Sequence, residues 1–285
     1  MKTVFNGASG PIHYHGTPIW GGAGAVHKVA VRNAGAFVSY VRRDQLKSSI
    51  EHADMVAIDN GAFSAWKSGK VIDWNGFYRD IYVTVHHEKV SFFVIPDVIT
   101  GDEDDNDKLL TGVPVGIKDK AIPVWHLHES IDRLKRLVND WGRVCLGSSG
   151  EYAVVRSPAW RRRMDEALMA IGNDRPYIHG LRMLDGRVLA EYPLTSADST
   201  NIACNVPKYT VIKPQITIEA CRRFVHYSKW FDPLGRVENA IAMLESCGGT
   251  KTDMLVERCA IWKNTIEMMK PPTFDRWVNE LRRFK

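Results

Sequence analysis

The sequence predicts an α/β protein built as a (β/α)8 TIM-type barrel with extra helices at the C-terminal end. Short runs of β-branched and aromatic residues alternate with longer amphipathic stretches between about residues 35 and 200 of the 285. Such alternation indicates a parallel sheet covered by helices. About eight β/α units in a chain of this length fit a barrel. An open doubly wound sheet is the alternative, but no GxGxxG motif opens a helical stretch.

Each predicted strand is a short apolar run that ends at glycine or polar residues. One more strand is expected, either at 28–32 (KVAVR) or at 209–213 (YTVIK). The other strands, in chain order, are GAFVSYV (35–41), MVAIDNGAF (55–63), VSFFVIPDVI (90–99), KAIPVWHLH (120–128), GRVCLGSSG (142–150), YIHGLRML (177–184) and YPLTSADST (192–200).

Helices are predicted between these strands, most clearly at 73–89, 129–141 and 157–172, and a polar helical segment is expected before residue 55. The acidic stretch 100–107 (TGDEDDND) is expected to be a solvated loop, because its carboxylates lack the spacing of a calcium loop. Two segments near the C-terminus, 217–231 and 272–284, are expected to be helices outside the barrel. With no repeat or linker to divide it, the chain is predicted to form a single domain over residues 1–285.

The composition is that of a globular protein, with 45% hydrophobic and 25% charged residues. No apolar run is long enough to span a bilayer, and the start, MKTVFNGASG, does not read as a signal peptide, so a cytoplasmic location is expected. Five cysteines without a CxxC or CxC pair argue against a disulfide framework and a closed zinc site. The net charge of +5 permits a polyanionic partner.

Polar residues gather where the predicted strands end. The carboxyl ends of barrel strands share one face, where catalytic groups sit, so we expect Asp59, Asp97 and Asp198 to converge on one site. Taken singly, Asp59 and Asp198 could instead cap the following helix, and Asp97 could be a turn residue. Further strand-end candidates are His126, His128, Gly147 to Gly150 and His179 to Met183.

Two of these candidates have a more specific pattern. His126 and His128 face the same side of a strand, and an HxH pair has metal-ligand spacing. The alternative is a histidine that hydrogen-bonds to substrate or to a neighbouring loop. The glycine-rich stretch CLGSSGEY (145–152) lets a ligand approach the backbone, whose N–H groups could bind a carbonyl or a phosphate.

In this order, the strand-end segments resemble the tRNA-guanine transglycosylase (queuine tRNA-ribosyltransferase) family, and most closely its phage and bacterial DNA 7-deazaguanine transglycosylases. The resemblance runs from about residue 55 to residue 205. It is carried by AIDNGAFSAW, FVIPDV, VCLGSSGEY, IHGLRML and TSADSTN.

The resemblance implies roles for individual residues. Asp198 would be the nucleophile and Asp59 a general acid/base beside it. Asp97 would bind the heterocycle. Gly147 and Ser148 would contact the carbonyl of the base, Met183 would lie against its ring, and His126 or His128 would replace a base-contacting glutamine. The implied reaction exchanges guanine in DNA for a 7-deazaguanine such as 7-cyano-7-deazaguanine, through a covalent aspartyl-glycosyl intermediate and without a cofactor or metal.

The chain departs from that family in one respect. The tRNA enzymes carry a CxCxxC…H zinc subdomain after the nucleophile, and the cysteines at 204, 221, 247 and 259 are too scattered to reproduce it. DNA is therefore the expected substrate and tRNA the alternative. A base in a duplex must be extruded before it reacts, and Arg161, Arg162 and Arg163 are candidates for holding the phosphates meanwhile.

Two functions of other classes are left open. His126, His128, His179 and Asp198 partly match the ligand order of metal-dependent amidohydrolase-type barrels, although the HxH pair falls in mid-barrel and no bridging lysine is evident. A non-catalytic nucleic-acid-binding protein is the other, because a fold alone does not establish activity. No membrane partner is expected, and the oligomeric state, a homodimer included, is left open.

Overall fold

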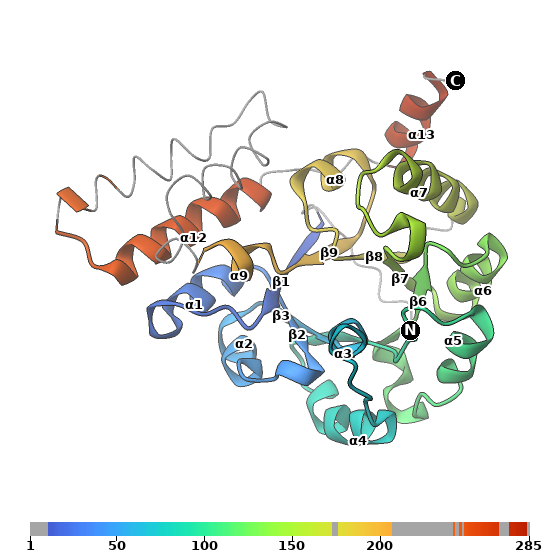
Figure 1. Cartoon of the computed structure of the whole chain (residues 1–285), viewed down its shortest axis with the longest axis horizontal. Coiled ribbons are helices and arrows are strands. Elements are labelled where there is room, and N and C mark those ends of the chain that lie inside the picture. The colour runs from blue at the N-terminus through green and yellow to red at the C-terminus, as the bar shows by residue number, and fades with distance from the viewer. Residues whose placement is uncertain are drawn as a thin grey trace.

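The computed structural model describes residues 11–172, 176–206, 248–267 and 274–283, together with 242, 245 and 246. The strands of these ranges form one sheet in the order β5-β4-β3-β2-β1-β9-β8-β7-β6. Neighbouring strands run parallel, and helices surround the sheet, which curls into a nearly closed barrel (Figure 1). The predicted TIM-type barrel is confirmed. Its strands are β1 (Ile12–Thr17), β2 (Gly35–Ser39), β3 (Met55–Asp59), β4 (Val90–Val94), β5 (Ala121–Ile122), β6 (Val124–His126), β7 (Arg143–Gly147), β8 (Tyr177–Leu181) and β9 (Ser196–Ser199).

The barrel closes through a strand that is divided in two. Pro123 separates β5 from β6, and proline interrupts a ladder because it has no backbone N–H. β5 pairs with β4, and β6 pairs with β7. The Pro123 carbonyl accepts a 2.8 Å hydrogen bond from the N–H of Cys145 on β7. β5 and β6 thus share one position in the barrel.

Apolar side chains fill the inside of the barrel, since every second residue of a strand points inward. At Gly35 an added Cβ would lie 2.4 Å from the buried Tyr14 ring, so a side chain there would displace the ring. The filled interior leaves the ends of the barrel as the places where a ligand can bind. The inward-facing buried residues are Tyr14, Phe37, Ala57, Phe92, Val94, Ile122, Val124 and Cys145.

Helices pack on the outer face of the barrel through two further apolar clusters. Trp125, Trp160 and Leu168 belong to one, and Phe77, Ile81 and Phe93 belong to the other. The helices are α1 (Ala25–Val31), α2 (Leu46–His52), α3 (Ala62–Ser68), α4 (Trp74–Val85), α5 (Glu103–Leu110), α6 (Ile131–Trp141), α7 (Pro158–Ile171), α8 (Gly186–Glu191), α9 (Asn201–Asn205), α12 (Lys251–Glu267) and α13 (Phe274–Arg283).

α12 packs along α1 on the outside of the barrel, on the left in Figure 1. The Cys259 thiol lies 3.6 Å from the carbonyl of Val26 in α1. On β1, His15 points away from the barrel interior, and its Nε2 lies 3.4 Å from Glu267 at the end of α12. The prediction of helices outside the barrel is confirmed for α13, which matches 272–284, while 217–231 lies outside the described residues.

Two predictions of local structure were wrong, and one strand was not predicted. Residues 28–32 belong mainly to helix α1 and not to a strand, because Val26, Ala30 and Val31 are buried at helical spacing. β1 had not been expected at 12–17. The acidic stretch 100–107 contains the first half of α5, whose N-terminus is capped by the Asp102 side chain on the N–H of Asp105. The alternative strand at 209–213 lies outside the described residues.

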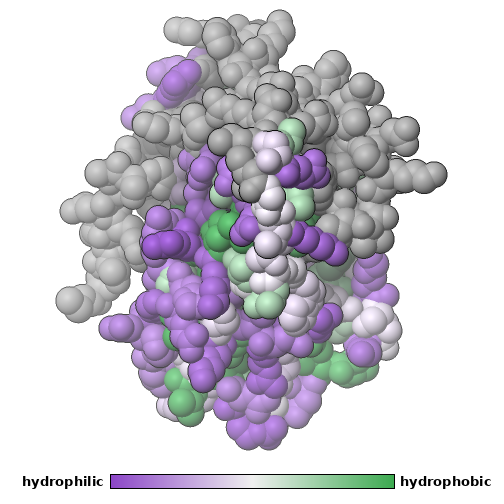
Figure 2. Space-filling view, turned by 90° about the vertical axis from the view of Figure 1, so that its left-hand side faces the viewer, coloured by the Kyte–Doolittle hydropathy of each residue, from purple (hydrophilic) through white to green (hydrophobic). Residues whose placement is uncertain are grey.

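Figure 2 shows the side of the molecule that lies on the left in Figure 1. Hydrophilic residues predominate among its coloured atoms, and hydrophobic residues appear there in small groups. In the part of the chain that the structure describes, no helix combines the length and the hydropathy needed to cross a bilayer.

Candidate active site

The three aspartates meet at the carboxyl-terminal end of the barrel. Asp59 ends β3, Asp198 lies next to the end of β9, and Asp97 follows β4. Burial, followed by the charges of Asp198 and Asp97, raises the pKa of Asp59 to about 7. Burial and the charges of the same three carboxylates also raise the pKa of Cys145, which lies inside the barrel. The acids therefore lie within electrostatic reach of one another around the barrel axis.

Asp198 is held by hydrogen bonds from β8 and from the turn after it. Its Oδ1 accepts from the backbone N–H of Arg182 at 2.8 Å and from His179 Nε2 at 3.3 Å. The other ring nitrogen, His179 Nδ1, lies 2.7 Å from Ser196 Oγ. The His179 ring is fully buried and stacks on Phe37 at 5.3 Å. These contacts fix one carboxylate oxygen of Asp198.

Asp198 does not cap the helix that follows it. At the start of α9, Ser199 Oγ accepts from the N–H of Asn201 at 3.0 Å. The hydrogen bond expected of a cap is therefore accepted by Ser199, while Asp198 accepts from Arg182 and His179.

Asp97 bridges two neighbouring segments of the site and is not a simple turn residue. Its Oδ1 accepts from Asn60 Nδ2 at 2.6 Å, and its Oδ2 from His126 Nε2 at 2.9 Å. Asn60 also donates to the carbonyl of Ile95 at 2.7 Å. Each carboxylate oxygen has a second lone pair, so Asp97 can still accept hydrogen bonds from a ligand.

The two histidines of the HxH pair have different partners. Their rings stack at 5.5 Å between centroids. His128 bonds to Ser149 Oγ at 2.7 Å, and His126 Nδ1 is buried without a partner among the described residues. An ideal Cβ at Gly147 would lie 3.1 Å from this Nδ1, so glycine leaves room for the ring.

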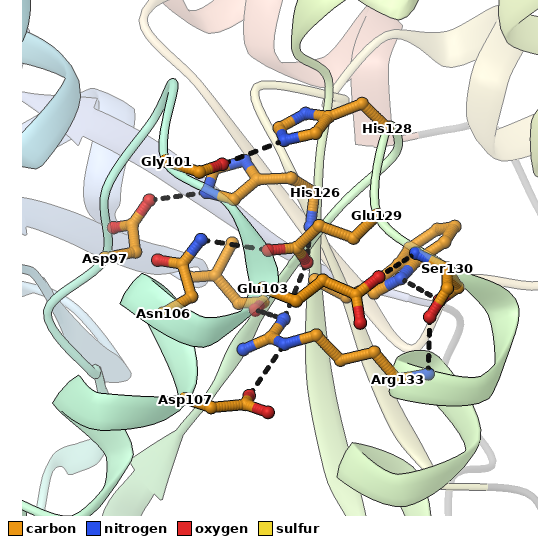
Figure 3. Close-up of polar contacts among 12 residues, drawn as sticks. Asp97, Gly101, Glu103, Asn106, Asp107, His126, His128, Glu129, Ser130 and Arg133 are labelled. Atoms are coloured by element: carbon orange, nitrogen blue, oxygen red, sulfur yellow. Dashed lines mark hydrogen bonds and ion pairs between the residues drawn. The ribbon is translucent and has the colours of Figure 1, made fainter.

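A buried ion-pair network fixes the loop that carries Asp97 and the strand that carries His126 (Figure 3). Glu129 accepts from the backbone N–H of His126 at 2.8 Å and from Asn106 Nδ2 at 2.9 Å. Asn106 Oδ1 in turn accepts from the N–H of Val98 at 2.7 Å. The Arg133 guanidinium pairs with Glu129 at 2.6 Å, and both side chains are 1% exposed. The network thus couples α5 and α6 to the two site segments.

Asp59 has the chemistry of an acid/base. It is half-buried, and its Oδ2 accepts from the N–H of Gly61 at 3.2 Å. Gly61 adopts φ of 83°, a left-handed conformation that favours glycine. This hydrogen bond lies at the start of α3, so the capping interpretation fits Asp59 in part. A carboxyl group with a pKa near 7 can both give and take a proton at neutral pH.

The side chains of Met183 and Ser148 already contact other residues of the protein. The Met183 side chain is fully buried in the outer apolar cluster, next to Gly180. Ser148 Oγ accepts from the indole N–H of Trp160 at 2.9 Å. In this structure Met183 is therefore not accessible to a ring, and its contact with a base stays a prediction.

Of the three arginines of α7, two bond within the molecule. Arg161 pairs with Glu191. Arg163 pairs with Glu166 at 2.6 Å and donates to the Leu127 carbonyl at 2.8 Å. Arg162 is exposed, and within the described ranges it makes no ion pair. The predicted phosphate contact thus fits Arg162 better than its neighbours.

Sequence reasoning missed Glu129, and it assigned no supporting role to Asn60, to the backbone of Arg182, or to Ser196 as partner of His179. Period-2 alternation could have indicated the last, because Ser196 and Asp198 share one face of β9, and Ser196 is paired with His179 in the β8–β9 register. No local pattern indicated the roles of Glu129 and of the Arg182 backbone, because Glu129 contacts Asn106 of α5 and the Arg182 N–H contacts Asp198 of β9.

Among the residues described here, no group of three or more histidine, cysteine, aspartate or glutamate side chains could hold a metal ion. Within these ranges, the residues that suggested a metal-dependent hydrolase do not form a metal-binding group. Neither a known protein-family model nor a curated protein matches the sequence.

Proposed function

We propose that this protein is a glycosyltransferase that exchanges guanine in DNA for a 7-deazaguanine base. The observation that carries the proposal is the difference between two nearby carboxylates. Asp198 is fixed by Arg182 and His179, while Asp59 has a pKa raised to about 7. A positioned nucleophile beside a proton-transferring acid is the pair that base exchange requires.

The reaction has two balanced steps. A carboxylate oxygen of Asp198 forms a bond to C1′ of the nucleoside as the C1′–N9 bond breaks. The electron pair of that bond leaves with guanine, which takes the proton of Asp59. Asp59, now a carboxylate, removes the N9 proton of the incoming base, whose nitrogen attacks C1′ and displaces Asp198. No cofactor is needed for either step.

Asp97 and His126 supply acceptors for the base. Guanine and 7-deazaguanines present N1–H and an exocyclic amine as donors. Asp97 retains free lone pairs, and His126 Nδ1 is buried without a partner in the described part of the chain. This pattern of acceptors favours a guanine-type ring over a base that presents acceptors at that edge.

The test is incorporation of labelled guanine, or of 7-cyano-7-deazaguanine, into DNA by the full chain, followed by digestion to nucleosides. We expect incorporation by the parent and none by Asp198→Ala. A denaturing gel should show a protein–DNA adduct with the parent and not with Asp198→Ala. Failure to incorporate either base, with no adduct, would contradict the proposal, and the same assay with tRNA tests that polymer.

A further inference from the structure

Two exposed aromatic rings lie next to the candidate active site. Phe63 and Trp66 belong to α3, which begins shortly after Asp59, and they are 36% and 52% exposed. They are separated by about one helical turn, and their ring centroids are 5.7 Å apart with the planes tilted by 43°. In Figure 1, α3 is drawn nearer the centre of the barrel than α4. Neighbouring exposed aromatic rings at such a place indicate a binding surface.

Arg182 connects these rings to Asp198. Its guanidinium lies 4.2 Å from the centroid of the Phe63 ring. Its backbone has φ of 59°, which is uncommon for a residue other than glycine, and its N–H donates to Asp198. The same residue thus anchors the candidate nucleophile with its backbone and extends the aromatic surface with its side chain.

Three basic residues lie on or near the segments that carry the rings. Arg182, Lys67 and Lys70 are all exposed. None of the three makes an ion pair with another described residue, unlike Arg161 and Arg163. Arg182 lies over the Phe63 ring, and Lys67 and Lys70 belong to α3 or directly follow it; cations next to aromatic rings complement a chain that carries phosphates between flat heterocycles.

We propose that Phe63, Trp66 and Arg182 form a stacking surface for a nucleobase adjacent to the reacting nucleoside of a polynucleotide. The inference rests on the proposed function for the identity of the reacting group. Extruding a base from a duplex removes a stacking partner from its neighbours. Aromatic rings and the guanidinium plane replace that partner and accept any base, because every base has a π-face.

The first test measures binding of a short single-stranded DNA with one central guanine, by fluorescence anisotropy. Phe63→Ala and Trp66→Ala should each weaken binding by about 5- to 100-fold, while Trp66→Phe should keep most of the affinity. Arg182→Ala should weaken binding more than Arg182→Lys, which keeps the charge. The control is Tyr82→Ala: Tyr82 is 43% exposed but lies near the end of α4, at the opposite end of the barrel.

A second arm locates the base. Removing the base next to guanine, to leave an abasic site, should weaken binding by the parent and have little effect on the Phe63→Ala/Trp66→Ala double variant. An unchanged affinity for both alanine variants would overturn the inference. So would an equal loss from an abasic site far from guanine, or a surface that binds anionic phospholipid vesicles but not DNA.

Base exchange separates this inference from the proposed function. If the parent exchanges guanine and the alanine variants keep its KM for DNA, the stacking surface is wrong and the enzyme stands. If no exchange occurs while binding depends on the rings and on the adjacent base, the surface stands and the enzyme is wrong.

Discussion

Burial and the neighbouring carboxylates place the titration of Asp59 near neutral pH. Its pKa rises from 3.8 to about 7. Between these values the folded protein holds a proton that the unfolded chain releases, so stability falls as pH rises and levels off above about pH 7. We expect Asp59→Asn to reduce the fall in the free energy of unfolding between pH 5 and pH 8 by about 2 kcal/mol. Urea unfolding of the parent and of Asp59→Asn at pH 5 and at pH 8 measures this difference in the free energy of unfolding.

Asp44→Asn is the control for that experiment. Asp44 is exposed, and a hydrogen bond from Arg42 lowers its pKa, so its contribution changes only at more acidic pH. An unaltered pH dependence in Asp59→Asn would contradict the assignment of the raised pKa.

Under the proposed function, Asp59→Asn should also lower kcat by about 10²- to 10⁴-fold, because the leaving base loses its proton donor.

At the scale of elements, the ion pair between Glu129 and Arg133 joins α6 to the segments that carry Asp97 and His126. Arg133→Met leaves Glu129 buried without its cation, and we expect it to lower the free energy of unfolding by about 3–5 kcal/mol. Arg136→Met is the matched control. Arg136 is 54% exposed and pairs with Asp107 at 3.0 Å, so its loss should cost less than about 1 kcal/mol. Equal effects in chemical denaturation would show that the buried pair is not coupled to the fold as described.

Whether the sequence predicted a strand depended on what its two faces contact. β4 and β7 were predicted because both faces are apolar, as between a filled barrel and its helices. β1 was missed because His13 and His15 occupy its outer face, where the partner is Glu267 of α12 and not an apolar helix. Residues 28–32 were misassigned because short apolar runs fit both periodicities.

For the candidate site, the sequence identified side chains at strand ends but not what holds them. Asp59, Asp97 and Asp198 were recognised because parallel strands must end at one face. Two hydrogen bonds depend on the conformations of loops: the bond from the His126 N–H to Glu129 and the bond from the Arg182 N–H to Asp198. Those conformations arise from packing, so a local pattern did not reveal them.

For the molecule as a whole, binding of a polyanion should depend on salt. Under the proposed function, the logarithm of the association constant for DNA falls linearly with the logarithm of salt concentration, and each phosphate contact adds about 0.7–0.9 to the slope. Arg162→Ala should reduce the slope by about 1. Lys118→Ala, in the 3-10 helix (Val115–Lys120) that leads into β5, should leave it unchanged, because the strands begin at the other end of the barrel. Titrations at several salt concentrations measure both, and equal slopes for all three proteins would contradict the contact.

The backbone and the side chain of Arg182 make different contacts, the first with Asp198 and the second with Phe63. Its main chain, and not its side chain, donates to Asp198, so a side chain that tolerates the φ of 59° can replace arginine at position 182 without removing that hydrogen bond. Under the proposed function, preference for a different polymer could then be acquired through single substitutions at this position, while the reacting carboxylates stay in place.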